Sequence, residues 1–272
     1  MSAMSDRVSI SIDGGVADVR LNRPDKLNAV DGAMFSGLVE AGESLKSDPS
    51  VRVVVLSGEG RGFCSGLDFA SFQAMGSGEF GAGLGDAPRR DDGRITNVGQ
   101  QAAYVWTEMP VPVIAAIHGP ALGAGFQIAL AADIRFIAPD AKMSVLEIRW
   151  GLVPDMTGTQ MLPRLVGLDV AKELAFTGRM LSGEEAVELG LATHLAEDPR
   201  AAALELAREI AAKNPYAIRG VKKLVNMAGQ ASLEEGFKAE ERTMGSLIGS
   251  PNNLEAVAAY FEKRDPVFKD VD

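Results

Sequence analysis

The feature of this sequence that most constrains its fold is a change of pattern near residue 198. Before that point, apolar strand-like runs alternate with glycine-containing turns and helical stretches, and after it only helical spacing remains. Alternation of strands and helices is typical of α/β proteins. We therefore predict an α/β core over residues 1–198, followed by a helical C-terminal region over residues 199–272.

The elements of the core follow from the spacing of apolar residues. Alternation with period two marks strands, whereas a spacing of three to four residues marks helices. The expected elements are a β-hairpin over 8–21, a helix over 24–45, strands over 51–56, 113–117 and 134–137, and a helix over 124–132.

Helix-capping patterns support this reading of the later part of the chain. Ser182 with Glu185, and Ser232 with Glu235, have the spacing of a capping box, in which a hydroxyl and a carboxylate satisfy first-turn N–H groups. Ser250 precedes a proline, which favours the first turn of a final helix.

The helical region carries more apolar surface than so short a segment is able to bury on itself. These apolar residues are Leu204, Leu206, Ile210, Leu224, Leu233, Phe237, Leu247 and Ile248. We expect them to pack against another subunit. The alternative is that these helices cover the core of their own chain.

Composition excludes several classes of protein. A net charge of −10, from 27 basic and 37 acidic residues, opposes binding to a polyphosphate backbone, so no nucleic-acid partner is expected. One cysteine and two histidines favour neither a disulfide framework nor a metal site. The chain has no apolar run long enough to span a membrane and no secretory signal pattern, so we expect a soluble, cytoplasmic protein.

Residues 76–85 are half glycine and are followed by several charged residues. This composition predicts a mobile loop that acts as a lid or a binding element. The pattern G-x-G-x-x-G at 76–81 is not interpreted as a dinucleotide site, because no apolar strand precedes it.

Two glycine-containing turns follow strands, at residues 63–68 and 119–125. Glycine allows the backbone to turn its N–H groups outward, and the second turn leads directly into a helix N-terminus, where N–H groups are unpaired. Two such turns are able to hold one developing negative charge.

Two acidic residues are candidates for proton transfer. Glu147 lies in an otherwise apolar stretch, where burial would raise its pKa toward general acid–base use. Asp155 follows eight residues later, near enough through a tight turn to share a pocket. The alternatives are that Glu147 is a salt-bridged structural carboxylate and that Asp155 caps the next helix. Cys64 is a weaker candidate nucleophile, because no histidine neighbours it in the sequence.

Several motifs occur in order along the chain: LNRPDKLNA at 21–29, FCSGLD at 63–68, PVIAAIHGPALGAG at 112–125, ADIR at 132–135, GLVP at 151–154, GTQ at 158–160 and FEKR at 261–264. With these motifs the chain resembles the crotonase, or enoyl-CoA hydratase/isomerase, superfamily from the hairpin to the C-terminus. The resemblance implies a spiral of ββα units with a helical trimerisation region, assembled as a homotrimer or as a hexamer of two trimers.

The same resemblance implies an acyl-CoA thioester substrate, with coenzyme A carried as part of the substrate and no separate cofactor. By position, the main-chain N–H groups of Leu67 and Ala124 would hold the thioester enolate. The residues implied in binding coenzyme A are Arg23, Lys26, Ser65, Asp68, Tyr260 and Lys263. Tyr260 and Lys263 belong to the C-terminal helix, which would contribute to the binding site of a neighbouring subunit.

Hydratases of this family carry glutamate at two positions, which hold Gln127 and Glu147 in this chain. Water addition uses a base and an acid, whereas moving a double bond between the 3- and 2-positions needs one carboxylate. We therefore predict an enoyl-CoA isomerase with Glu147 as proton carrier. Asp155 resembles the second proton carrier of dienoyl-CoA isomerases. The alternatives are an enoyl-CoA hydratase of fatty acid β-oxidation and a catalytically weak acyl-CoA-binding paralogue.

Overall fold

The computed structural model describes residues 6–69 and 94–271. Within these ranges, a six-stranded sheet has the order β1-β2-β3-β4-β6-β9 and a three-stranded sheet has the order β5-β7-β8. The strands are β1 (Val8–Asp13), β2 (Val16–Leu21), β3 (Val53–Gly58), β4 (Val113–Ile117), β5 (Pro120–Leu122), β6 (Ile134–Ile137), β7 (Lys142–Ser144), β8 (Leu181–Ser182) and β9 (His194–Leu195). β1 and β2 form the predicted antiparallel hairpin, and the later strands of the larger sheet pair in parallel.

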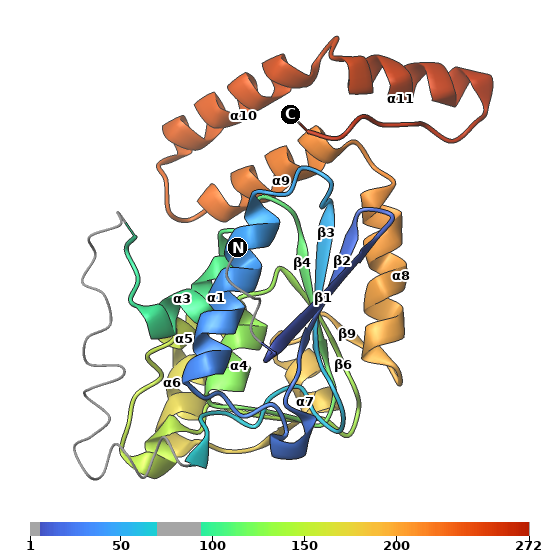
Figure 1. The fold of residues 1–272 in the computed structure, drawn as a ribbon. Coiled ribbons are helices and arrows are strands. Elements are labelled where there is room, and N and C mark those ends of the chain that lie inside the picture. Colours follow the sequence, from blue (N-terminus) through green and yellow to red (C-terminus); the bar gives the residue numbers. More distant parts are fainter. Residues whose placement is uncertain (1–5, 70–93, 272) are drawn as a thin grey trace.

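Helices cover both faces of the larger sheet. The helices are α1 (Gly32–Lys46), α3 (Val98–Thr107), α4 (Ala124–Leu130), α5 (Gly158–Val166), α6 (Leu168–Thr177), α7 (Gly183–Glu188), α8 (Pro199–Ala211), α9 (Pro215–Met227), α10 (Leu233–Leu247) and α11 (Pro251–Glu262). α1, α3 and α4 lie on one side of the sheet and α8 on the other (Figure 1). Because both faces are covered, every residue of β3 and β4 is buried. The predicted α/β class with a helical C-terminal region is confirmed.

The predicted helix over 24–45 begins later than its spacing indicates. A single 3-10 turn, η1 (Pro24–Lys26), is followed by Leu27 and Asn28 with φ of 49° and 58°, which end it. α1 begins at Gly32, after Asp31 accepts a hydrogen bond from Met34 N. The helical prediction was therefore wrong for 27–31, because side-chain contacts of Asn28 with distant loops hold the backbone in a left-handed turn.

Part of the apolar face of the C-terminal region packs within its own chain. Leu204, Leu206 and Ile210 of α8 pack against the larger sheet, so the expected subunit contact was wrong for these three residues. Leu233, Phe237 and Ile248 are exposed on and after α10, and Leu224 and Leu247 are half-buried. α8 is the first helix of the predicted C-terminal region, but it packs on the core. Packing therefore does not separate the two regions at residues 198 and 199, and this boundary stays a prediction.

The predicted caps are present, one of them in part. Ser232 and Glu235 form a complete capping box, and Ser250 caps α11 with proline following it. Ser182 accepts from Glu185 N, but the Glu185 side chain pairs with Arg179.

The glycine-rich loop predicted over 76–85 lies outside the described residues. In the ranges that the structure describes, no helix is both long and apolar enough to cross a bilayer.

We expect Lys222→Met to lower the free energy of unfolding by about 3 kcal/mol. Lys222 of α9 is buried, and its Nζ donates to Asp133 Oδ2 at 2.7 Å and to Val111 O at 2.9 Å. Removing the amine leaves a partly buried carboxylate and a carbonyl without this donor. Urea unfolding at fixed protein concentration measures the change. Lys223→Met, at the exposed neighbouring position, is the control, and equal losses in both variants would contradict the role of the buried pair.

Candidate active site

A cavity of about 480 Å³ brings the two glycine-containing turns together with the segment 146–156. The predicted site residues that line it are Ser65, Leu67, Ala124, Gln127, Glu147 and Asp155. The rest of its described wall consists of Phe35, Gly66, Phe69, Asn97, Gly99, Gly123, Leu146, Trp150, Leu152, Val153 and Met156. The structure therefore gathers two carboxyl groups and both turns around one largely apolar pocket.

The main-chain N–H of Leu67 is unpaired because of the way its turn joins a neighbouring segment. Val30 N donates to Gly66 O at 2.8 Å, and Asp68 N donates to Val30 O at 2.9 Å, as in a parallel ladder. Successive N–H groups of an extended segment point to opposite sides, so the N–H of Leu67 points away from Val30. Among the described residues it has no hydrogen-bond acceptor.

Ala124 supplies a second unpaired N–H. It is the first residue of α4, and N–H groups of a first helical turn have no acceptor within the helix. No other acceptor for it is found in the described part of the chain. Hydrogen bonds from Cys64 N to Pro120 O (2.8 Å) and from Leu122 N to Cys64 O (3.0 Å) join the two turns. A pair of free N–H groups in one cavity is able to stabilise an oxyanion.

The side-chain amide of Gln127 holds Glu147 in place. Only one orientation of this amide satisfies the hydrogen bonds around it. Its Oε1 accepts from Met156 N at 2.8 Å and from Gly158 N at 2.9 Å, so its Nε2 faces Glu147 and donates to Oε1 at 2.6 Å. The other oxygen of Glu147, Oε2, is buried and has no hydrogen-bond partner within the described residues. Because this oxygen is not engaged and Glu147 lines the cavity, the carboxyl is free to hold or release a proton there.

Burial raises the pKa of the Glu147 carboxyl above its ordinary value of 4.5, and the nearby negative charge of Asp155 acts in the same direction. Hydrogen bonds from Gln127 and from neighbouring main-chain groups oppose this rise without cancelling it. No basic side chain of the described residues pairs with Glu147, so the alternative of a salt-bridged structural carboxylate does not hold there.

Asp155 lines the same cavity. Its side chain is accessible to solvent, but the cavity walls displace part of its hydration, and this partial burial raises its pKa. α5 begins after Thr157, and no side chain caps it, so the alternative that Asp155 is a helix cap was wrong.

Comparison with known proteins places the chain in a family. The family model described as Enoyl-CoA hydratase/isomerase matches residues 11–271. The chain belongs to this family. The mouse mitochondrial methylglutaconyl-CoA hydratase is 36% identical over 262 residues, which cover 94% of this chain and 80% of that protein. The mouse mitochondrial enoyl-CoA hydratase domain-containing protein 2 is 38% identical over 261 residues, with coverage of 93% and 84%.

Solved structures agree with this membership. The crystal structure of an enoyl-CoA hydratase from Bacillus anthracis matches with a TM-score of 0.87 at 31% identity, covering 97% of this chain and 99% of that one. The resemblance to the crotonase superfamily and the fold that it implies are confirmed. The names of these relatives support the hydratase alternative better than the predicted isomerase.

The residues predicted to bind coenzyme A in this family member lie in four different settings. Lys26 is exposed at the end of η1. Ser65 lines the cavity, and its Oγ donates to the main-chain oxygen of Lys26 at 3.3 Å. Arg23 and Asp68 form an ion pair at 2.6 Å, with only 15% and 13% of their side chains exposed.

Tyr260 and Lys263 lie far from the cavity of their own chain. Tyr260 lies in the last turn of α11 and Lys263 directly follows it, and Figure 1 places this helix at the opposite end of the molecule from η3 (Glu147–Trp150). A role of these two residues in binding coenzyme A would therefore concern a neighbouring subunit's cavity, as the family resemblance implies.

Trp150 and Val153 contribute an apolar wall of the cavity that was not predicted from the sequence. Both side chains are exposed at the cavity. The available signal was the run of large apolar residues between Glu147 and Asp155, which has neither helical nor strand periodicity. Exposed apolar groups of this kind mark binding surfaces.

The raised pKa of Glu147 predicts a pH dependence of stability. A carboxyl with a higher pKa in the folded state binds its proton more tightly there, so its contribution to stability is fully present below the unfolded pKa. Relative to Glu147→Gln, the wild-type free energy of unfolding should therefore be highest below pH 4.5 and fall as the pH rises through the folded pKa. Urea unfolding across a pH series checks this. A difference that grows in favour of the wild type with rising pH would contradict it.

Proposed function

We propose that this protein is an acyl-CoA enzyme that transfers a proton at C2 of an enoyl thioester, with Glu147 as proton carrier. The observation that carries the proposal is that one cavity is lined by Glu147, Leu67 and Ala124, and that within residues 6–69 and 94–271 the Oε2 of Glu147 and the two main-chain N–H groups have no hydrogen-bond partner. A thioester oxygen bound by two N–H groups makes C2 more acidic, because the charge of the enolate rests on that oxygen. Family membership supports an acyl-CoA substrate.

Addition of water to a 2-enoyl-CoA is the net reaction that the relatives' names favour. Gln127 is held as a hydrogen-bond donor and carries no transferable acid proton, so Glu147 serves both steps. It takes a hydrogen from water as the water oxygen bonds to C3, and it then delivers that hydrogen to C2. Between the steps, the enolate charge rests on the thioester oxygen beside Leu67 and Ala124.

Isomerisation is a second candidate, and the amide at Gln127 favours it. In this reaction Glu147 removes a proton from C2 of a 3-enoyl thioester, the double bond moves to the 2-position, and the proton returns to C4. One carboxyl is sufficient for the whole sequence. Asp155, whose pKa is also raised by burial, is the candidate partner for delivery to a more distant carbon.

Product analysis in heavy water tests the proposal. The protein is incubated separately with a 2-enoyl-CoA and a 3-enoyl-CoA, and the products are followed by mass spectrometry and by the absorbance of the conjugated enoyl group. Hydration removes that absorbance and adds one molecule of heavy water, whereas isomerisation creates the absorbance and incorporates deuterium. Tight binding of both thioesters without either product would overturn the proposal in favour of a catalytically weak acyl-CoA-binding protein.

Gln127→Glu is expected to raise the hydration rate by about ten-fold or more. The new carboxyl would keep the two main-chain donors on one oxygen and turn the other toward Glu147, now 2.6 Å from Nε2, so the pair would share a proton. One group then activates water while the other protonates C2. Initial hydration rates measure the effect, with Gln230→Glu as an exposed control. An unchanged or lower rate would contradict the role assigned to Gln127.

The remaining expectations belong to the same proposal. Isomerisation moves protons only, and hydration adds the oxygen of water to C3 and a proton to C2 without an external oxidant or reductant, so no cofactor beyond the coenzyme A of the substrate is required. The exposed apolar residues of α10 and α11 support assembly as a trimer or hexamer, which a solution mass measurement would test. Cytoplasmic localisation stays a prediction from the sequence.

A further inference from the structure

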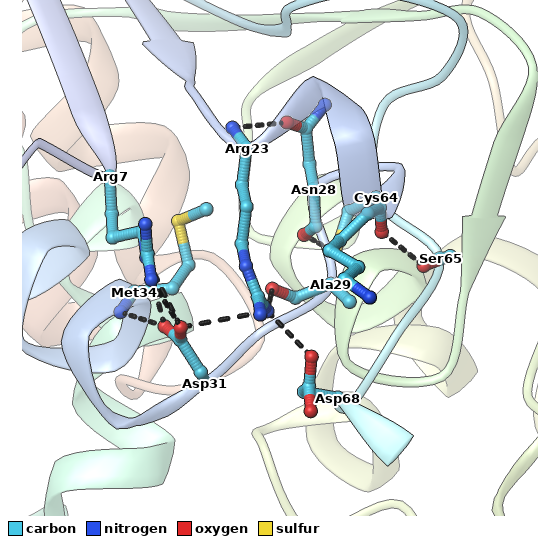
Figure 2. Close-up of polar contacts among 10 residues, drawn as sticks. Arg7, Arg23, Asn28, Ala29, Asp31, Met34, Cys64, Ser65 and Asp68 are labelled. Atoms are coloured by element: carbon cyan, nitrogen blue, oxygen red, sulfur yellow. Dashed lines mark hydrogen bonds and ion pairs between the residues drawn. The ribbon is translucent and has the colours of Figure 1, made fainter. Parts of the chain in front are cut away.

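Beside the cavity, four charged side chains form a chain of alternating sign (Figure 2). Arg7 donates to Asp31 Oδ2 at 2.9 Å, and Arg23 lies 3.5 Å from the same oxygen. Arg23 Nη1 also donates to Asp68 Oδ2 at 2.6 Å. Arg7, Asp31, Arg23 and Asp68 are referred to below as the ion chain.

The ion chain links the start of α1 to the turn that carries Leu67. Asp31 caps α1 by accepting from Met34 N at 2.8 Å. Asp68 directly follows Leu67, and its own N–H is held by Val30 O. The position of the Leu67 N–H is therefore set on one side by the main-chain ladder and on the other by the carboxylate of the next residue.

The contacts of Arg23 allow it to fix the position of the turn that carries Leu67 and Asp68. Its guanidinium reaches Asp68, Asp31 and the main-chain oxygen of Ala29, the last at 3.1 Å. The planar fork of arginine makes such a set of contacts directional. A pair as buried as Arg23 and Asp68 adds little net stability, because lost hydration offsets the attraction. Its main effect is to fix geometry.

The turn also has supports that do not depend on this ion pair. Asn28 Nδ2 donates to Gly62 O at 2.8 Å. Cys64 Sγ donates to Asn28 O at 3.1 Å (Figure 2). Ser65 N donates to Leu27 O at 2.9 Å. Loss of the Asp68 charge should therefore shift the end of the turn near Leu67 and leave the rest folded.

We propose that Arg23 and Asp68 are positioning residues that hold the Leu67 N–H against the thioester oxygen, and that they do not bind coenzyme A. This inference rests on the function proposed above. Loss of one such donor lowers a rate by about 10²–10³-fold, so a partial displacement is expected to lower it by about ten-fold.

The test compares Asp68→Asn with Arg7→Met. Asp68→Asn keeps the shape of the side chain and removes the charge beside Leu67, so we expect kcat to fall by about ten-fold with KM changed less than about two-fold. Arg7→Met breaks the other end of the ion chain, away from the turn, and should leave kcat within about two-fold. Should Asp68→Asn fail to fold, Arg23→Lys gives the same comparison, because lysine keeps the charge and loses the fork.

A second measurement reads the N–H position without catalysis. The infrared stretch of the thioester carbonyl in a bound saturated acyl-CoA shifts to lower frequency when N–H groups polarise it, and Asp68→Asn should reduce this shift. A raised KM with unchanged kcat and an unchanged carbonyl shift would assign the pair to coenzyme A and overturn the inference. Equal losses in Asp68→Asn and Arg7→Met would do so as well, in favour of a general structural role.

The two proposals fail in different ways. If the wild type polarises the carbonyl but forms no product from any enoyl thioester, the proposed reaction is wrong, and the carbonyl shift in Asp68→Asn still decides the positioning role. If the wild type turns substrate over and Asp68→Asn matches it in kcat and in carbonyl shift, only the positioning role is wrong.

Discussion

Glu147→Gln is expected to lower the rate of proton exchange at C2 of a bound acyl-CoA by about 10²–10⁴-fold. The amide has nearly the same shape, and its oxygen would still accept from Gln127 Nε2, so the geometry of the wall is kept. What is lost is the ionisable carboxyl of a residue that lines the cavity, and an amide does not carry a proton between carbon atoms. Deuterium incorporation at C2, followed by mass spectrometry at saturating thioester, measures the change.

The matched control for this prediction is Glu205→Gln, an exposed position on α8 at which the same charge is removed. Its exchange rate should equal that of the wild type. The affinity of Glu147→Gln for a saturated acyl-CoA should also stay within a few-fold, because binding does not require the proton. An exchange rate unaffected by Glu147→Gln would remove the central assignment of this site.

Ala124→Pro is expected to lower kcat by about 10²–10³-fold while α4 stays folded. Proline deletes the N–H that faces the cavity, and its ring fills the space where a thioester oxygen would bind. Ala124 is the first residue of α4, the position at which proline is best tolerated, since no intrahelical hydrogen bond is lost there. Steady-state kinetics gives the loss, and far-ultraviolet circular dichroism reports whether the helices remain.

Two further variants make this result interpretable. Ala124→Gly retains the N–H and should keep kcat within about ten-fold, even though glycine weakens a helix by about 1 kcal/mol. Leu67→Pro removes the other free N–H and leaves the ladder intact, because Val30 pairs with Gly66 O and Asp68 N. A folded Ala124→Pro or Leu67→Pro variant with normal kcat would rule out the paired N–H groups as the enolate site.

The strands and the hairpin were predictable because their signals are local. Between Val8 and Leu21, apolar and polar residues alternate on both sides of a glycine turn, as in a hairpin. The apolar run at 113–117 has the same bounds as β4. The start of α1 was not predictable in this way. Helical spacing continues backward from Gly32, but Asn28 makes side-chain bonds to Glu59 O and Gly62 O, more than thirty residues away, and these contacts hold it in a left-handed turn.

In the candidate site, too, features with a local signal were predictable from the sequence, and features that depend on distant contacts were not. Glu147 was recognisable because its neighbours in the sequence are apolar, and the structure places it in a cavity with a raised pKa. The sequence did not show that Met156 N and Gly158 N hold Gln127 in one orientation. The same is true of the pairing of Arg23 with Asp68, which the sequence had suggested as separate contacts for coenzyme A.

The sequence by itself determined the family, the alternation of strands and helices, and the identities of the single glutamate and the two turns. Each of these depends on residue type and local spacing. The tertiary structure alone decided which polar groups are satisfied and which remain free. Leu67 and Ala124 keep N–H groups for which the described part of the chain offers no acceptor, whereas Arg23 and Asp68, 45 residues apart, neutralise each other. Such pairing depends on the segments that come together when the chain packs, so it is not predictable from the local spacing of residues.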